Sequence, residues 1–202
     1  MDLDGCHFAM PYLVQQNKRN GGEPLGEEAD ILAGGKHVVV IGGGDTASDC
    51  IGTAFRQGAL EVTQLDIRPC PPEHEDKLLV WPYWPTKFRT STSQAEGVER
   101  QFACATLAIV GKNGRVTGVR CARVDEKRQP LPGTEFTIQA ELVLIAIGFA
   151  GPAEGKLLEQ LPLERDTRTN VKADTEDYRT SHPKVFAAGD MRKGQSLVVW
   201  AI

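Results

Sequence analysis

The glycine-rich run at residues 42–47 has the residue types and spacing of a phosphate-binding turn. In a Gly-x-Gly-x-x-Gly/Ala turn, the first glycine makes a sharp bend and the second lets the backbone approach a pyrophosphate. The third small residue lets a helix pack closely on a strand. The spacing predicts a dinucleotide site, and the alternative is a turn that only connects two elements. The candidate cofactor-binding residues of this turn are Gly42, Gly43, Gly44, Asp45, Thr46 and Ala47.

The elements on both sides of this turn are the ones that a dinucleotide site requires. Residues 37–41 are β-branched and continuously apolar, which is typical of a strand buried on both faces of a parallel sheet. From Thr46 to Gly58, small and apolar residues recur at helical spacing, and residues 61–67 indicate a second strand. The helix start would supply N–H groups and a positive dipole end to the phosphates. A carboxylate such as Asp45 also gains from that dipole, so a purely structural role for it stays open.

Two charged residues follow the second strand, where such sites distinguish NADH from NADPH. Asp66 would accept hydrogen bonds from the ribose hydroxyls of NADH and repel the extra phosphate of NADPH. Arg68, on the same side of an extended chain, would instead pair with that phosphate. We give NADH a slight preference, and the third interpretation is that both are solvated charges at a strand end.

The rest of the chain indicates further elements and few chemical groups. A helix is predicted over residues 7–17, followed by a linker over 18–35, and three aromatic residues lie in a proline-rich loop over 69–85 that packs on its own domain or contacts the cofactor. These aromatic residues are Trp81, Tyr83 and Trp84. Antiparallel strands are predicted at 102–110, 116–124 and 136–140 with a turn at 112–114, and further strands at 141–147 and 184–190.

Composition excludes several classes of function. A net charge of -4 argues against nucleic acid or an anionic membrane as the main partner. No apolar run approaches the roughly 20 residues of a membrane span, and the start of the chain lacks the pattern of a signal peptide, so we expect a cytoplasmic protein. The five cysteines contain no C-x-x-C pair and the four histidines are scattered, so we assign no metal site and no catalytic side chain.

Several motifs together resemble a known family. They are Gly-Gly-Gly-Asp-Thr-Ala at 42–47, the Pro/Trp loop, Ala-Ile-Gly-Phe at 146–149, Phe-Ala-Ala-Gly-Asp at 186–190, and Gly-Gln-Ser-Leu-Val-Val-Trp-Ala-Ile at 194–202. They are similar to the small subunit, or C-terminal reductase region, of glutamate synthase, and the resemblance runs nearly end to end. The resemblance implies an α/β fold of the glutathione-reductase type, in which a Rossmann-like NAD(P)-binding domain is inserted into an FAD domain.

The resemblance also implies the domains and the cofactors. Residues 1–35 would be an interdomain helix and linker, 36–150 the NAD(P)H-binding domain, and 151–202 a C-terminal segment of the FAD domain. A hydride would pass from NAD(P)H to FAD, and electrons would continue through iron–sulfur clusters to FMN on a large subunit that makes glutamate from glutamine and 2-oxoglutarate. The implied cofactor-binding residues outside the glycine turn are Gly148, Gly189, Asp190, Gln195 and Ser196.

Two features of the family are missing from this sequence. It has no second glycine fingerprint for the FAD pyrophosphate and no N-terminal cysteine cluster, so it resembles a fragment of the reductase. We therefore expect a colourless protein that binds NAD(P)H, retains little FAD, is inactive alone and hides apolar residues in a homodimer. The alternatives are the reductase module of another iron–sulfur flavoprotein, similar to dihydropyrimidine dehydrogenase, and a non-catalytic nucleotide-binding or docking domain.

Overall fold

The computed structural model of the chain describes residues 3–27, 29–80, 87–153 and 155–202. The chain divides into two compact units, which are Met1–Ile147 and Gly148–Ile202. The glycine turn at residues 42–47 lies in the first unit, and the Gly-Asp motif at residues 189–190 lies in the second.

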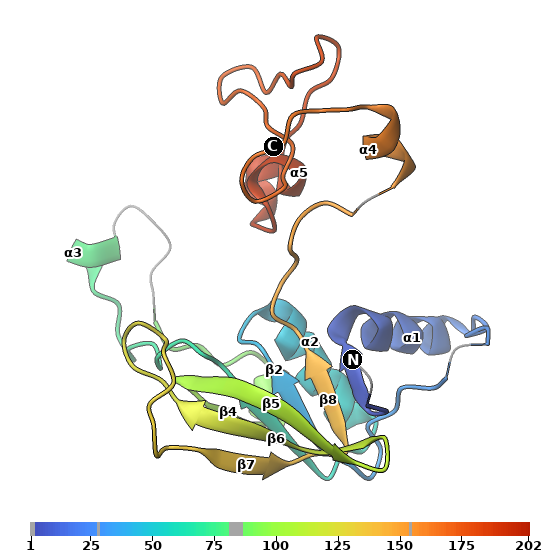
Figure 1. Ribbon diagram of the computed structural model, residues 1–202, viewed down its shortest axis with the longest axis vertical. Coiled ribbons are helices and arrows are strands. Elements are labelled where there is room, and N and C mark those ends of the chain that lie inside the picture. Colours follow the sequence, from blue (N-terminus) through green and yellow to red (C-terminus); the bar gives the residue numbers. More distant parts are fainter. Residues whose placement is uncertain (1–2, 28, 81–86, 154) are drawn as a thin grey trace. The chain divides into compact units, whose positions relative to one another are not determined.

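A five-stranded, all-parallel sheet forms the centre of the first unit (Figure 1). Its strands lie in the order β1-β8-β2-β3-β4, and every neighbouring pair is parallel. The carboxyl ends of the three central strands therefore meet at one edge, where open α/β sheets bind their ligands. The strands are β1 (Cys6–Phe8), β2 (His37–Ile41), β3 (Glu61–Leu65), β4 (Glu99–Gln101) and β8 (Leu142–Ile145).

Helices α1 (Ala9–Gly21) and α2 (Asp45–Arg56) contribute to the core on one face of this sheet. Val38 and Val40 of β2 belong to that core, whereas Val39 belongs to the core on the opposite face. This alternation is the period of two that a strand imposes on its side chains. All three valines are at most 1% exposed, so the prediction that β2 is buried on both faces is confirmed.

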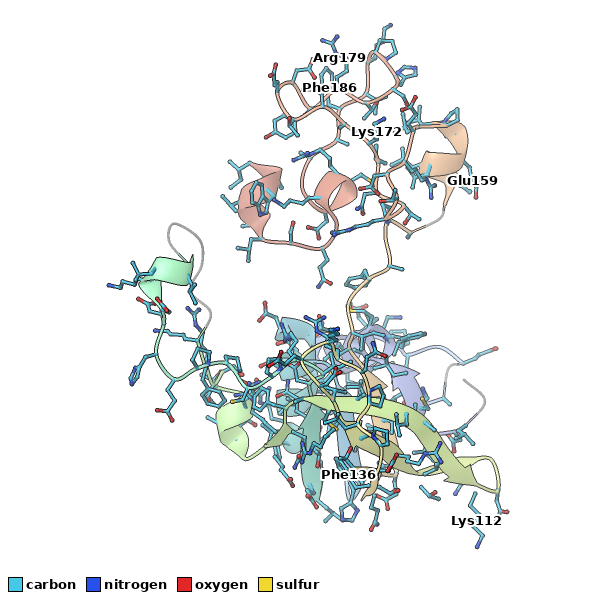
Figure 2. The ribbon with its side chains drawn as sticks, turned by 60° about the vertical axis from the view of Figure 1, so that its left-hand side comes forward. Lys112, Phe136, Glu159, Lys172, Arg179 and Phe186 are labelled. Atoms are coloured by element: carbon cyan, nitrogen blue, oxygen red, sulfur yellow. The ribbon has the colours of Figure 1, made fainter. Side chains whose placement is uncertain are left out.

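A three-stranded antiparallel sheet covers the other face, with β5 (Cys104–Lys112), β6 (Arg115–Arg123) and β7 (Phe136–Gln139) in that order. These are the three antiparallel strands that the sequence predicts, within two residues at each end. The predicted turn is also confirmed, because Asn113 and Gly114 have the positive φ angles of 52° and 77° that a two-residue hairpin needs. Lys112 lies at this end of the hairpin (Figure 2).

The start of the chain differs from the prediction of a helix over residues 7–17. The helix begins at Ala9 and ends at Gly21, after which Gly22 adopts a left-handed conformation with a φ of 70°. The preceding residues form β1, which pairs with β8 at the edge of the sheet. A three-residue strand is too short to show alternation in sequence, so its pairing depends on a partner more than a hundred residues away.

The segment predicted as a linker over residues 18–35 is helical as far as Gly21, and its remaining described residues are irregular but attached to the first unit. Ile31 and Ala33 are buried in the core that contains α1 and α2. The backbone N–H of Ile31 donates to Oε1 of Gln15 over 2.9 Å, and that of Ala33 donates to Oε1 of Gln57 over 2.8 Å. Two glutamines therefore hold this segment to α1 and to the end of α2.

Two short helices follow β3 before the chain reaches β4. The predicted loop over residues 69–85 contains one helical turn, α3 (Lys77–Val80), and η1 (Gln94–Glu96) is a 3₁₀ helix. Trp81, Tyr83 and Trp84 lie outside the described residues, so their predicted packing or cofactor contact stays a prediction.

The second unit consists of short helices and irregular chain around Leu158, Val171 and Ala187. The strand predicted over residues 184–190 is wrong. Phe186 forms only an isolated bridge with Arg179, and both are labelled in Figure 2. A strand needs a neighbouring ladder, and the described part of this unit supplies only isolated bridges around it. The helices are α4 (Lys156–Gln160), α5 (Asp190–Lys193) and the 3₁₀ helix η2 (Val198–Ala201).

Across the described residues, no helix combines the length and the apolar character that crossing a bilayer requires.

Candidate functional site

Gly42 makes the bend between β2 and α2. Its φ of 135° is a conformation that side-chain-bearing residues rarely adopt. A Cβ at this position would lie 2.2 Å from the carbonyl oxygen of Ala146, directly after β8. The chain can therefore turn beside the end of β8 only because residue 42 is glycine.

Gly44 leaves open space at the start of α2. It is the N-cap residue of the helix, its φ is −96°, and no side chain caps the helix. A Cβ on Gly44 would have no protein atom within 4 Å. The first N–H groups of α2 are thus available to an anion that approaches over Gly44. Asp45 is the first residue of the helix and is not its cap.

Ala47 is the small residue that the fingerprint requires at its third position. It is fully buried in the core between α2 and the sheet. A larger side chain here would separate the helix from β2, so the predicted packing role of Ala47 is confirmed. The binding roles of the turn residues, including Thr46, stay predictions.

Gly43 faces the charged pair at the end of β3. A Cβ on Gly43 would lie 1.7 Å from Oδ2 of Asp66 and 2.5 Å from a guanidinium nitrogen of Arg68. The structure therefore brings the two predicted discriminating residues against the glycine turn, although Asp66 and Arg68 follow Gly44 by 22 and 24 positions in the sequence.

Asp66 and Arg68 are bonded to each other. Nε of Arg68 donates to Oδ1 of Asp66 over 3.0 Å, and Nη2 donates to Oδ2 over 2.8 Å. The backbone N–H of Arg68 also donates to Oδ1 over 2.9 Å. Burial of Asp66 opposes its ionisation, but these hydrogen bonds outweigh it and hold the pKa of Asp66 below its ordinary value. The interpretation as a solvated strand-end charge is therefore wrong for Asp66, which is buried, whereas Arg68 is exposed.

Two hydrogen-bonded glutamines, which the sequence analysis did not identify, fix the backbone of the glycine turn. Nε2 of Gln64 donates to the carbonyl oxygen of Gly42 over 2.9 Å, and Nε2 of Gln94 donates to Oε1 of Gln64 over 3.0 Å. Gln64 is 2% exposed, and a polar residue inside the apolar strand β3 is the signal that could have indicated it. Its amide thereby joins the glycine turn to the segment that carries Gln94.

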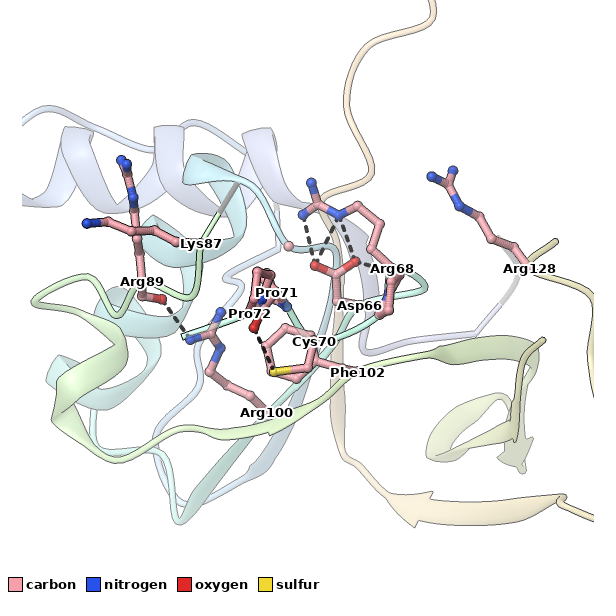
Figure 3. A pocket seen from close by; sticks show the side chains of 12 residues that line it. Asp66, Arg68, Cys70, Pro71, Pro72, Lys87, Arg89, Arg100, Phe102 and Arg128 are labelled. Carbon is pink, nitrogen blue, oxygen red and sulfur yellow. Dashed lines mark hydrogen bonds and ion pairs between the residues drawn. The ribbon is translucent and has the colours of Figure 1, made fainter. Parts of the chain in front are cut away.

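A cavity of about 550 Å³ lies beside Gly43 at the carboxyl end of β3 (Figure 3). Most of the charged side chains that line it are cationic, and Asp66 is the one carboxylate among its described lining residues. Such a cavity attracts anions, because the surplus positive charge is concentrated in one concave surface. The lining cations are Arg68, Lys87, Arg89, Arg100 and Arg128.

Arg100 is held in place on one wall of this cavity. Its guanidinium lies 4.7 Å from the ring centroid of Phe88 and 4.8 Å from that of Phe102. One of its Nη atoms donates to the backbone carbonyl of Arg89 over 2.9 Å. The two rings and this hydrogen bond fix the guanidinium, whose Nε is buried without a partner among the described residues.

The predicted flavin-site residues come together within the second unit. Oδ1 of Asp190 accepts a hydrogen bond of 3.1 Å from the backbone N–H of Ser196. Gly189 has a φ of 58°, and its N–H donates to the carbonyl oxygen of Trp200 over 2.9 Å. Gly148 has a φ of 94°, and a Cβ there would lie 3.3 Å from Oε1 of Gln195. These contacts form one local cluster, and its role toward a flavin stays a prediction.

Comparison with protein families gives one match that spans most of the chain. Residues 12–202 match the family described as pyridine nucleotide-disulphide oxidoreductase. The matched range contains both the glycine turn and the Asp190 cluster.

Curated relatives match the whole chain. It is 45% identical to the glutamate synthase [NADPH] small chain of Mycobacterium tuberculosis, covering 100% of this chain and 42% of that protein. It is 37% identical to the glutamate synthase [NADH] of Schizosaccharomyces pombe, covering 100% of this chain and 10% of that protein. The chain thus spans less than half the length of these relatives. The resemblance to glutamate synthase small subunits that the motifs indicate is confirmed.

Solved structures agree on the fold. Thioredoxin reductase from T. acidophilum has a TM-score of 0.61 and 22% identity, covering 95% of this chain and 50% of that one. A FAD-dependent pyridine nucleotide-disulphide oxidoreductase from Desulfovibrio vulgaris has a TM-score of 0.56 and 23% identity, covering 95% and 41%. At these identities the likeness shows the fold alone, and it confirms the predicted α/β class with a parallel sheet.

Proposed function

This chain belongs to the pyridine nucleotide-disulphide oxidoreductase family, and from that membership we propose that it is the NAD(P)H-binding part of a glutamate synthase small subunit. The observation that carries the proposal is the open approach over Gly44, which ends at the uncapped start of α2. The relatives of the whole chain support it, because their names specify glutamate synthases that use NADPH or NADH.

The residues of the first unit fit a dinucleotide. Gly44 would let the pyrophosphate approach the backbone, and the first N–H groups of α2, with Asp45 and Thr46, would bind its oxygens. Gly42 and Gly43 would keep the turn compact, since neither position has room for a Cβ. The adenosine end would then extend toward Asp66 and the cationic cavity at the end of β3.

When bound, NAD(P)H supplies a hydride and FAD accepts it, so the chain needs no catalytic side chain. The work of its residues is to hold and orient the cofactors. In the second unit, Asp190 would accept hydrogen bonds from the flavin's polar chain, with Gly189, Gln195 and Ser196 beside it and Gly148 in the same cluster. The 3₁₀ helix η2 would lie against the flavin ring system.

The remaining parts of the proposal concern domains and partners. We assign residues 36–150 to the NAD(P)H-binding domain, 151–202 to the FAD domain and 1–35 to the interdomain region. The partner would be a glutamate synthase large subunit carrying FMN and iron–sulfur clusters. We also expect a cytoplasmic location, in which the cysteines stay reduced. The 63%, 77% and 99% exposure of Leu197, Val198 and Ile202 supports a homodimer that covers them.

The proposal is tested by calorimetric titration of the 202-residue chain with NADPH and with NADH. We expect at least one of them to bind with one site per chain, and we expect Gly44→Val to abolish that binding, because its side chain would fill the approach to α2. Unchanged binding by the Gly44→Val chain would place the nucleotide elsewhere and contradict the proposal.

A further inference from the structure

We propose that the second unit binds a phosphate-class oxyanion, free or carried on a small molecule, in a cavity of its own. The cavity has a volume of about 490 Å³, and its described lining side chains come from residues 166–200. Its cations are Arg168, Arg192 and Lys193. Asp190 and the other predicted flavin-binding residues are not among the described lining residues, so the inference goes beyond the proposed nucleotide and flavin sites.

Arg192 carries the group that points most directly to a ligand. Its Nε is buried, and the described part of the chain offers this atom no hydrogen-bond partner. The guanidinium lies 5.2 Å from the ring centroid of Tyr178, a contact that orients the guanidinium through the ring face and leaves its N–H groups to other partners. A guanidinium N–H that is removed from water costs free energy unless it meets an acceptor. An oxyanion in the cavity would supply that acceptor.

Lys193 is the next residue of α5, and an aromatic ring positions it as well. Its Nζ lies over the ring of Trp200, which also lines the cavity. An ammonium group keeps three N–H donors, so contact with a ring face leaves donors for an anion. Two adjacent cations of α5 are therefore placed at this cavity by two different rings.

Arg168 belongs to a turn that is closed by Asp166. Oδ1 of Asp166 accepts hydrogen bonds from the backbone N–H groups of Arg168 over 2.8 Å and of Asn170 over 2.9 Å. The N–H of Val171, directly after the turn, donates to the carbonyl oxygen of Met191 over 2.9 Å. These bonds fix the backbone of Arg168 and join its turn to α5, so cations from two segments line one cavity.

The carboxylates beside these cations are engaged by backbone N–H groups. Asp166 is the one carboxylate among the described lining residues. Asp174 lies outside that lining but interacts electrostatically with Arg192. Its Oδ1 accepts hydrogen bonds from the N–H groups of Glu176 over 2.6 Å and of Asp177 over 3.2 Å. Both acids thus stabilise their own turns, and the cavity keeps a surplus of positive charge.

The arrangement fits a phosphate group better than a carboxylate. A phosphate carries up to two negative charges and offers three or more oxygens that point in different directions, so it can meet cations from separate walls at once. A carboxylate has one charge and two oxygens in one plane, and it would pair with a single guanidinium. Thr167 and Thr175 also line the cavity, and their hydroxyl groups would donate to the remaining phosphate oxygens.

The test titrates the full, isotope-labelled chain with inorganic phosphate, glycerol phosphate and succinate, followed by NMR. The reporter is the Nε–H signal of Arg192, assigned as the signal that Arg192→Lys removes. The cavity variants are Arg192→Gln and Arg168→Gln, read from the backbone amide of Lys193. The matched control is Arg179→Gln, which removes an exposed guanidinium of the same unit from outside the described lining. Melting temperatures show whether each variant remains folded.

We expect phosphate to shift the Arg192 signal until the site is saturated, and succinate to bind at least about threefold more weakly. Arg192→Gln should weaken phosphate about 10-fold and Arg168→Gln about threefold or more, because each loses a charge-assisted hydrogen bond. Arg179→Gln should bind as the unaltered chain does, and added sodium chloride should weaken binding. Tighter binding of glycerol phosphate than of phosphate would identify a phosphomonoester as the ligand, and equal affinity would identify free phosphate.

An Arg192 Nε–H signal that stays in place as phosphate is added to the folded chain would overturn the inference. An equal loss of affinity in Arg179→Gln and in the cavity variants would also overturn it, because only net charge would then matter. Succinate that binds as tightly as phosphate would contradict the assigned class of ligand. If Arg192→Gln fails to fold, the signal of the unaltered chain and the affinity of Arg168→Gln decide.

Discussion

The carboxylate of Asp66 occupies the place where a side chain of residue 43 would be, since a Cβ on Gly43 would lie 1.7 Å from its Oδ2. The middle glycine of the turn is therefore required by the ion pair at the end of β3. The outer glycine, Gly42, is required by something else, the backbone carbonyl of Ala146 at 2.2 Å. Alanine should therefore lower the free energy of unfolding for a different reason at each of the two positions.

Gly43→Ala should destabilise the first unit by about 1–3 kcal/mol, because the methyl group displaces Asp66 from its hydrogen bonds with Arg68. In a chain that already carries Asp66→Ala, the same substitution should cost much less, because the side chain that it meets is gone. Urea denaturation of the four chains measures this coupling. Gly42→Ala is the control, since it meets backbone and should show no rescue by Asp66→Ala. Additive costs for Gly43 and Asp66 would contradict the assigned contact.

Gly44→Ala should separate binding from stability. Residue 44 has an ordinary φ of −96° and open space around it, so we expect the free energy of unfolding to change by less than about 0.5 kcal/mol. The added methyl group would stand in the path of the pyrophosphate, and nucleotide affinity should fall about 10-fold or more, equivalent to about 1.4 kcal/mol. Calorimetry and urea denaturation give both quantities. A stable variant with full affinity would show that no phosphate approaches here.

Gln64→Leu should loosen the glycine turn, although leucine has nearly the same volume. The substitution removes the donor to Gly42 and the acceptor for Gln94 from a buried position, which should cost about 1–3 kcal/mol for the groups left unpaired. Gln94→Leu removes the bond to Gln64 and the one that Oε1 of Gln94 accepts from the backbone N–H of Ser91, but it keeps the donor to Gly42 and lies at a half-buried position, so it should cost less. Equal stability of the Gln64→Leu chain and the unaltered chain, measured by thermal denaturation, would refute the role of this network.

Much of the fold could be predicted because local patterns and tertiary contacts agree. The apolar run at β2 is buried on both faces, and the Asn113–Gly114 turn joins the predicted hairpin. The failures are segments whose structure is decided elsewhere in the chain. β1 exists because β8 offers it an edge, and the apolar residues around Phe186 form no strand because no neighbouring ladder is present beside them among the described residues.

The site was predictable to the same extent. The positions of Gly42, Gly44 and Ala47 follow from a short spacing rule, and Asp66 follows from its spacing of about 20 residues from these glycines. The ion pair between Asp66 and Arg68 needed side-chain geometry that no spacing contains. Lys87 and Arg128 are far apart in sequence, and only the packing of the antiparallel sheet on the parallel sheet brings them to one cavity.

Asp66 should make the stability of the first unit sensitive to acid. Its pKa in the folded state is below the value of about 3.9 expected for an unfolded chain, so the unfolded state takes up the proton first as the pH falls. Its contribution is thus present above about pH 4 and is lost as the pH falls through the folded pKa. In Asp66→Asn the loss of stability below about pH 4 should be shallower. Parallel pH profiles for both chains, from urea denaturation, would contradict this.

Arg68→Gln should raise the pKa of Asp66. Burial is the largest influence on this carboxyl group and disfavours its charged form, and it is outweighed at present by hydrogen bonds and charge from Arg68. Glutamine lacks the charge and the paired donors, so burial would then dominate and the proton would be held to a higher pH. The titration of the Asp66 carboxyl carbon, followed by NMR, measures the shift directly. Arg120→Gln, which removes a guanidinium from an exposed position on β6, should leave the curve in place. A pKa that is unchanged in Arg68→Gln would mean that Arg100 or the backbone N–H of residue 68, and not the Arg68 side chain, keeps Asp66 ionised.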